Sequence, residues 1–149
     1  IEAVKPVIER LKETGWTFGS HTWGHIRLDS RPLESVQRDT VRWAEEVGSL
    51  VGPTNILFYP HGGRPDGDDW HSTGPVFQYL QSQGFRIFAS VGINSFSYIK
   101  KDISAVICDR LHPDGTTLRN GKALEWYSQF YDAREIIDLD VRPDLGVTW

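Results

Sequence analysis

The chain has 149 residues, of which 39% are hydrophobic and 24% are charged, and its formal net charge at pH 7 is −4. This composition is typical of one folded globular domain, and the lack of a basic excess argues against nucleic acid as a partner. No run of about 18 apolar residues occurs, so no membrane-spanning segment is predicted, and the single cysteine, Cys108, excludes a disulfide framework and a cysteine-based zinc site.

Apolar residues alternate along the chain between helical spacing and short strand-like runs. The first three predicted elements are a helix over 2–14, a buried strand over 16–19 and a helix over 33–50. They are followed by a strand over 55–59, a helix over 75–83, and strands over 85–91 and 103–108. Asp29 and Ser30 are candidate N-caps for the second helix, with Pro32 in its first turn. Cys108 ends the last strand, where we expect a buried, inert thiol.

The segments between and after these elements carry weaker signals. We expect residues 92–102 to be irregular, 113–115 to form a turn, 118–132 to be partly helical and 137–149 to be an extended terminus. We expect one domain over 1–149. Because the chain opens on Ile1, part-way through a helical pattern, we also expect an N-terminal portion to precede it.

Strands that alternate with helices of about ten residues predict an α/β fold with a mostly parallel sheet. In such folds the chemistry is carried by loops at the carboxyl ends of the strands. His21, His25, His61 and the pair Asp109-Arg110 all follow predicted strands. We therefore expect these side chains to gather at one edge of the sheet.

The stretch Ser20-His21-Thr22-Trp23-Gly24-His25 places two histidines four residues apart. Neutral imidazole is the commonest protein ligand for zinc and similar metals. A helix would put both rings on one face, and a wound loop at the end of a strand would also bring them together. The spacing alone is also compatible with two unrelated histidines.

This stretch, with the helix and Gly15 before it, resembles the second motif of NodB-type polysaccharide deacetylases, carbohydrate esterase family 4. The family's next motif, Arg-x-Pro-x-Gly, has a matching frame at Phe58-Tyr59-Pro60-His61-Gly62, in which Phe58 stands in the place of the arginine. The Asp109-Arg110 and Asp114-Gly115 pairs resemble a divergent Gram-positive branch. The likeness covers nearly the whole chain, in order.

The resemblance implies an incomplete or irregular (β/α) barrel that removes acetyl groups from polysaccharides with a divalent metal, usually Zn2+. It assigns His21 and His25 as the two histidine ligands of the metal. The family's aspartate ligand and its catalytic base come from a Thr-Phe-Asp-Asp motif that this sequence lacks. We expect that motif upstream of Ile1.

Three further residues are catalytic candidates by the same resemblance. The backbone N–H of His61 is the expected oxyanion donor, unless this is a plain turn with an exposed imidazole. Arg110 could replace the missing arginine and hold the base aspartate ionised; the alternative is a structural ion pair with Asp109 or Asp114. His112 is a candidate general acid, or a surface histidine before Pro113.

Substrate contacts are expected from Tyr59, Trp23 and Trp70. Trp23 could wall the site or pack in the core, and Trp70 lies in a polar loop that could face carbohydrate or only solvent.

Three functions follow from these features. The first is a metal-dependent hydrolase that deacetylates a cell-envelope or extracellular polysaccharide, with its signal or anchor upstream of this chain. The second is an inactive NodB-like domain that binds glycan or a protein partner. The third is a hydrolase of another amide, such as a small cyclic one. The sequence leaves the oligomeric state open.

Overall fold

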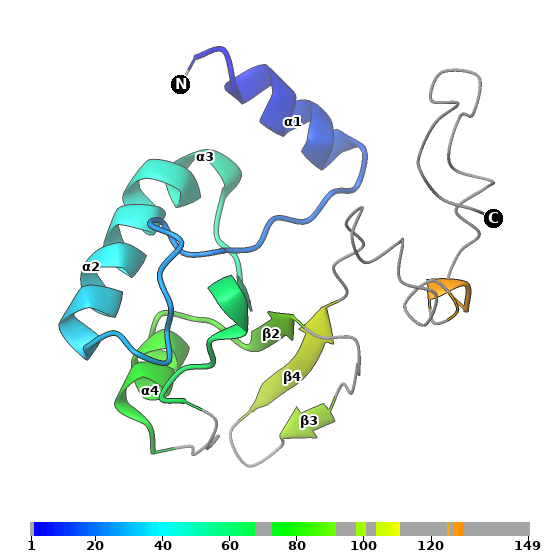
Figure 1. Cartoon of the computed structure of the whole chain (residues 1–149). Coiled ribbons are helices and arrows are strands. Elements are labelled where there is room, and N and C mark those ends of the chain that lie inside the picture. Colours follow the sequence, from blue (N-terminus) through cyan, green and yellow to red (C-terminus); the bar gives the residue numbers. More distant parts are fainter. Residues whose placement is uncertain are drawn as a thin grey trace, which may run out of the picture. The chain divides into compact units, whose positions relative to one another are not determined.

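The computed structural model describes residues 2–67, 73–91, 98–100 (backbone only), 104–110, 125 and 127–129. It divides into two compact units, 1–110 and 111–149. The first unit carries all the helices and strands discussed below (Figure 1). In the second unit, Glu125 and Tyr127 are helical, and the hydroxyl of Ser128 donates to the carbonyl of Glu125.

Helix α1 (Lys5–Glu13) begins where Pro6 fits the first turn, because an N–H is not needed there. It is followed by Gly15 in a left-handed conformation (φ 87°). Of the predicted apolar face, Ile8 is buried, whereas Val4 and Val7 are 48% and 57% exposed. The helix is therefore confirmed, but in the described residues its apolar face is only partly covered.

The long second helix is confirmed but interrupted. Helix α2 (Leu33–Trp43) continues through a π-helical turn (Ala44–Gly48) into helix α3 (Ser49–Val51), and Gly52 ends it at φ 91°. Pro32, which has no polar side-chain group, is the N-cap. The prediction that Asp29 or Ser30 caps this helix is wrong.

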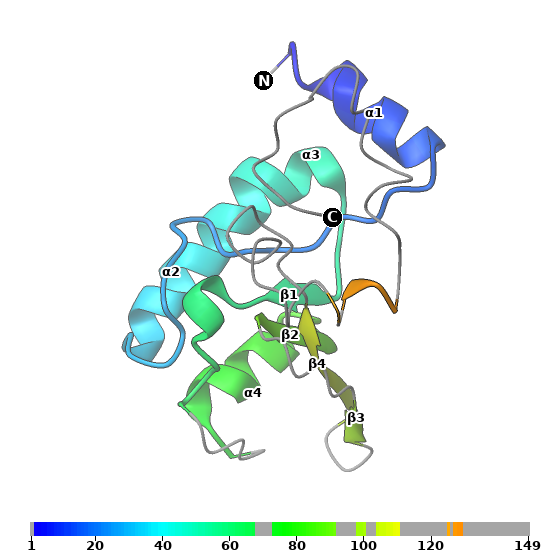
Figure 2. The same cartoon turned by 45° about the vertical axis from the view of Figure 1, so that its right-hand side comes forward.

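Four strands form one sheet in the described part of the chain, in the order β1-β2-β4-β3 (Figure 2). Strands β1 (Ile56–Phe58), β2 (Ile87–Val91) and β4 (Ala105–Arg110) are parallel. Strand β3 (Tyr98–Lys100) pairs antiparallel with β4, although residues 92–102 were expected to be irregular. The α/β class is confirmed with a small, mostly parallel sheet, and the barrel stays a prediction.

The predicted buried strand over 16–19 is wrong. Trp16 is 66% exposed, and within the described ranges the pairing with the sheet begins at Ser20, which forms a parallel bridge with Leu57. The N–H of Ser20 donates to the carbonyl of Ile56, and its own carbonyl accepts from the N–H of Phe58. This bridge holds the start of residues 20–25, the histidine loop, against β1.

The core lies between one face of the sheet and the helices α2 and α4 (Pro75–Ser82), which confirms the predicted third helix. In Figures 1 and 2 these two helices lie on the same side of the sheet. The buried residues of the core are Leu28, Val36, Leu57, Tyr59, Val76, Phe77, Leu80, Phe85, Phe88, Ala105 and Ile107. Cys108 is half-buried, whereas full burial was expected. The pKa of its thiol is raised, mainly by burial and to a lesser extent by the negative charge of Asp109.

Candidate metal and catalytic site

Three histidines meet beside the carboxyl end of β1. The ring centroids of His21 and His25 are 4.9 Å apart, and those of His25 and His61 are 4.5 Å apart, both pairs in edge-on contact. His21 and His25 come from the loop that follows the Ser20 bridge, and His61 comes from the turn after β1. The structure thus brings together the three histidines that the sequence placed after strands.

A wound loop, not a helix, brings His21 and His25 together. Thr22 and His25 are in the left-handed region, at φ 62° and 51°. The N–H of Thr22 donates to the hydroxyl of Ser20 (3.2 Å), and the hydroxyl of Thr22 accepts from the N–H of Ile26 (3.1 Å). These short-range bonds close the loop on itself. Of the two geometries left open by the spacing, the structure has the loop.

His21 is oriented by the backbone of β1. Its Nδ1 lies 2.9 Å from the carbonyl oxygen of Phe58. A carbonyl can only accept, so in the neutral ring Nδ1 carries the proton and Nε2 keeps its lone pair. Burial lowers the pKa of His21; the bond to Phe58 opposes this, and the charge of Arg110 lowers the pKa further. The neutral ring that a metal requires is therefore favoured.

His61 occupies a strained position in the 3₁₀ turn Pro60–Gly62, at φ 56° and ψ 15°. Its side chain is exposed. The turn is held from β2, because the hydroxyl of Ser90 donates to the carbonyl of Gly62 (3.3 Å). On its other side, Gly63 lies against the carboxylate of Asp29, where a Cβ would come within 3.0 Å of the carboxylate. The predicted oxyanion donor, the N–H of His61, thus lies in a fixed turn.

Arg110 ends β4 on the side of His21. Its Cζ lies 5.9 Å from the centroid of the Phe58 ring. Its Nε is buried and has no hydrogen-bond partner within the described ranges. Asp109 and Arg110 point to opposite faces of the strand, and the described ion pairs include none between them. Asp114, the other partner considered, lies outside the described residues.

Two of the expected substrate contacts, Tyr59 and Trp23, lie in the described residues. The side chain of Tyr59 is fully buried in the core against Phe88; its expected contact with the substrate stays a prediction. Trp23 is 40% exposed rather than a core residue: its indole N–H donates to Glu46 (2.8 Å), and Arg42 stacks 3.5 Å from its ring.

Two other predicted site residues cannot be placed. Trp70 and His112 lie outside the described residues, so their predicted roles in substrate binding and acid catalysis stay predictions.

The described residues contain no group of three histidine, cysteine or carboxylate side chains placed to hold a metal. They contain two adjacent imidazoles, those of His21 and His25. In His21, the bond from Nδ1 to the carbonyl of Phe58 leaves the lone pair on Nε2. Metal-binding histidines commonly donate their second ring nitrogen to a carbonyl in this way. The donor set therefore fits part of a zinc site, which takes at least three protein ligands.

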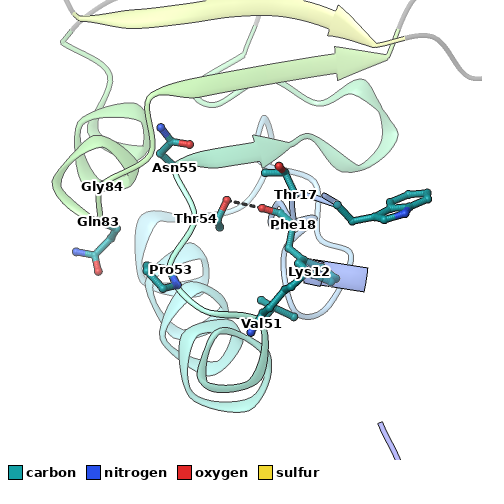
Figure 3. A pocket seen from close by; sticks show the side chains of 10 residues that line it. Lys12, Thr17, Phe18, Val51, Pro53, Thr54, Asn55, Gln83 and Gly84 are labelled. Atoms are coloured by element: carbon teal, nitrogen blue, oxygen red, sulfur yellow. Dashed lines mark hydrogen bonds between the residues drawn. The ribbon is translucent and has the colours of Figure 1, made fainter. Parts of the chain in front are cut away.

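A pocket of about 660 Å³ lies at the other end of the strands (Figure 3). Asn55 and Gly84, which precede β1 and β2, line it together with Lys12 and Trp16 from the end of the first helix. In its wall the hydroxyl of Thr54 donates to the carbonyl of Phe18 (2.7 Å). The pocket lies away from the histidines, which follow the carboxyl ends of the strands.

None of the described helices could span a membrane.

One residue at the site escaped the sequence analysis. Asp39 on α2 is 9% exposed and accepts hydrogen bonds from the backbone of the histidine loop. The signal was present, because Val36, Asp39 and Trp43 share the buried face of α2 at spacings of three and four. An acidic residue on an apolar helix face points to a buried partner, but nothing in the sequence identifies that partner.

Comparison with known proteins gives one match. The polysaccharide deacetylase family model matches residues 1–86, more than half of the chain. The matched region contains the histidine loop, β1, the turn at His61 and α4. No curated protein and no solved structure matches the chain.

Proposed function

The chain belongs to the polysaccharide deacetylase family, and we propose that it removes acetyl groups from a cell-envelope or extracellular polysaccharide with the help of a divalent metal, most simply Zn2+. Family membership supports an acetylated carbohydrate as the substrate. The metal, the cellular location and the divergent Gram-positive branch are parts of the proposal.

The observation that carries the proposal is the orientation of His21 beside His25. The bond from Nδ1 of His21 to the carbonyl of Phe58 leaves Nε2 as the only ring atom with a free lone pair. The second imidazole lies next to it, at 4.9 Å between ring centroids. In this proposal both rings hold the metal, and the third ligand is the aspartate that the family supplies from its first motif.

The reaction needs a nucleophilic water and a place for negative charge on the carbonyl oxygen. A bound divalent metal supplies both, because it lowers the pKa of water and polarises the carbonyl. Water adds to the acetyl carbon and gives a proton to the proposed base carboxylate. The bond to the sugar nitrogen or oxygen then breaks, the released amine or alcohol takes up a proton, and acetate is the other product. The backbone N–H of His61 is proposed to donate to the oxygen that becomes negative.

Arg110 is proposed to hold the catalytic carboxylate ionised. Its guanidinium lies over Phe58, the residue that stands in the place of the family's arginine, and its buried Nε has no partner in the described part of the chain. A buried guanidinium is stabilised by a carboxylate partner. The base aspartate of the first motif is a suitable partner.

A second candidate function is binding of acetylated glycan without turnover. Phe58 favours it, because the family's motif arginine is missing, and so does the lack of a third metal ligand among the described side chains. In that case the histidine cluster would be a remnant of the family's site.

The two functions separate in one experiment. Acetate release is measured from acetylated glucosamine oligosaccharides and from acetylated cell-wall glycan, with zinc-loaded protein and with the His21→Ala variant. Release by the wild type alone supports the hydrolase. Binding of the oligosaccharide without acetate release supports the second function, and release by both proteins contradicts the proposed role of His21.

A further inference from the structure

The backbone of the histidine loop donates to the carboxylate of Asp39 on α2. Oδ1 of Asp39 accepts from the N–H of Trp23 at 2.8 Å, and Oδ2 accepts from the N–H of Gly24 at 2.7 Å. These two amides belong to consecutive residues that lie between His21 and His25. One side chain of α2 thus uses both of its oxygens on the backbone that links the two predicted ligands.

The contact is buried and charge-assisted. Asp39 is 9% exposed, and Val36 and Trp43 on the same face of α2 are also buried. Bonds from backbone N–H groups to a carboxylate are shorter and stronger than bonds between neutral groups. Because the carboxylate is largely out of water, loss of one N–H contact would leave a buried polar oxygen without a donor.

Gly24 makes this approach possible. A Cβ at Gly24 would lie 3.1 Å from Oδ2 of Asp39 and 3.4 Å from the side chain of Ile26. The first distance is tighter than most contacts of a real Cβ, so a side chain at this position would displace the carboxylate or the loop. Gly24 and Asp39 are thus fitted to one another.

The same helix holds the loop a second time, further along. Glu46 accepts from the indole N–H of Trp23, and Arg42 lies against its ring. These contacts come from one face of the helical stretch, because Asp39, Arg42 and Glu46 follow one another at spacings of three and four. Trp23 is therefore fixed at its backbone by a buried group and at its ring by exposed ones.

We infer that Asp39 is a positioning residue that sets the backbone between His21 and His25, and with it the relative placement of the two imidazoles. The inference rests on the proposed metal site. Asp39 acts through the loop and touches neither imidazole in the described contacts. Its removal should change how well the two rings bind a metal together, in addition to any loss of stability.

The test compares Asp39→Asn with Glu45→Gln, an exposed acid-to-amide change on the same helical stretch, and with wild type. Zinc affinity of the full chain is measured by competition with a chromophoric chelator, at a temperature where thermal unfolding shows every variant to be folded. Groups that orient metal ligands typically contribute about 10- to 100-fold to affinity. We expect a loss in that range for Asp39→Asn and no change for Glu45→Gln.

A second readout needs no metal. Long-range 15N–1H spectra of the metal-free protein report which nitrogen of each histidine carries the proton. We expect the His21 and His25 signals to shift in Asp39→Asn and to stay unchanged in Glu45→Gln. If Asp39→Asn does not fold, Gly24→Ala replaces it, because the added methyl group crowds the same contact from the other side.

The outcomes are distinct. A folded Asp39→Asn protein with wild-type zinc affinity and unshifted histidine signals would overturn the inference, even if its melting temperature falls, because Asp39 would then be purely structural. If wild-type protein binds no zinc, the proposed function fails, and the histidine signals alone then decide the role of Asp39.

Discussion

The guanidinium of Arg110 lies over the ring of Phe58, with 5.9 Å between Cζ and the ring centroid. Phe58 stands where the related motif has an arginine, and Arg110 brings a cation to the same place from the end of β4. Its charge also reaches His21, since it is one of the groups that lower the pKa of that ring. A cation beside the predicted ligands is thus kept, but it comes from a different strand.

Removal of this charge should raise the pKa of His21. In Arg110→Gln, burial still lowers that pKa, but the repulsion by the guanidinium is gone. An NMR titration of the histidine ring signals measures the change. Arg38→Gln, in which the lost cation is exposed on α2 and donates to Ser35, is the control, and an equal shift in both variants would argue against a specific effect of Arg110.

The stability of the metal-free protein should fall on acidification through the histidine range. The pKa of His21 is lowered in the folded state, so below about 6.5 the unfolded chain takes up a proton before the folded chain does. The contribution of His21 is therefore complete above that pH and is lost between it and the lower folded-state value. Urea unfolding at pH 5 and 7 should show a smaller difference in His21→Gln than in wild type.

Gly19 should tolerate no side chain while Phe58 is present. A Cβ at Gly19 would lie 2.5 Å from Cε2 of Phe58, so Gly19→Ala forces the ring or the loop to move. Overpacking of this kind costs about 1–3 kcal/mol of unfolding free energy. Chemical denaturation measures it. The cost should shrink in a Phe58→Leu background, and an unchanged cost there would locate the strain elsewhere.

Asp66 should contribute to the stability of α4. Its two carboxylate oxygens accept from the N–H groups of Val76 and Phe77, at 3.1 and 2.9 Å. Removal of a carboxylate that binds the first amides of a helix costs about 0.5–2 kcal/mol. Asp66→Ala should lower the unfolding free energy by that amount in urea titrations, whereas Glu45→Gln, on an exposed helical surface, should leave it unchanged.

Gly24→Ala and Asp39→Asn should not be additive. Each disturbs the contact between Oδ2 of Asp39 and the backbone of Gly24. When two changes break the same interaction, the double variant loses less than the sum of the single losses. A double-mutant cycle on unfolding free energy measures this coupling, and strict additivity would show that the two residues do not act through one contact.

The sequence predicted where the three histidines gather better than it predicted the burial of the residues around them. The gathering of His21, His25 and His61 followed from the rule that loops at the carboxyl ends of parallel strands share one edge. The burial of Tyr59 could be predicted, because Tyr59 follows Leu57 by two residues and its extended backbone turns its side chain to the same side. Motif position and alternation therefore suggest different roles for Tyr59, and its contact with the substrate stays a prediction.

Other features could not be predicted from local patterns. The three residues of β3 owe their strand conformation to pairing with β4, and a strand this short has no periodicity of its own. The exposure of Trp16 and the clamp by Asp39 depend on long-range contacts. Propensity carries no information about which distant backbone a helix face will meet.

The most direct test of the metal site is the zinc content of protein that includes the first-motif aspartate, as wild type and as His21→Ala, His25→Ala and His61→Ala, after dialysis against a weak chelator. We expect near-stoichiometric zinc in wild type and in His61→Ala, because the His61 ring contacts His25 but is not a proposed ligand, and loss of zinc in the other two variants. Zinc retained by His21→Ala or His25→Ala, or absent from wild type, would contradict the proposed metal site.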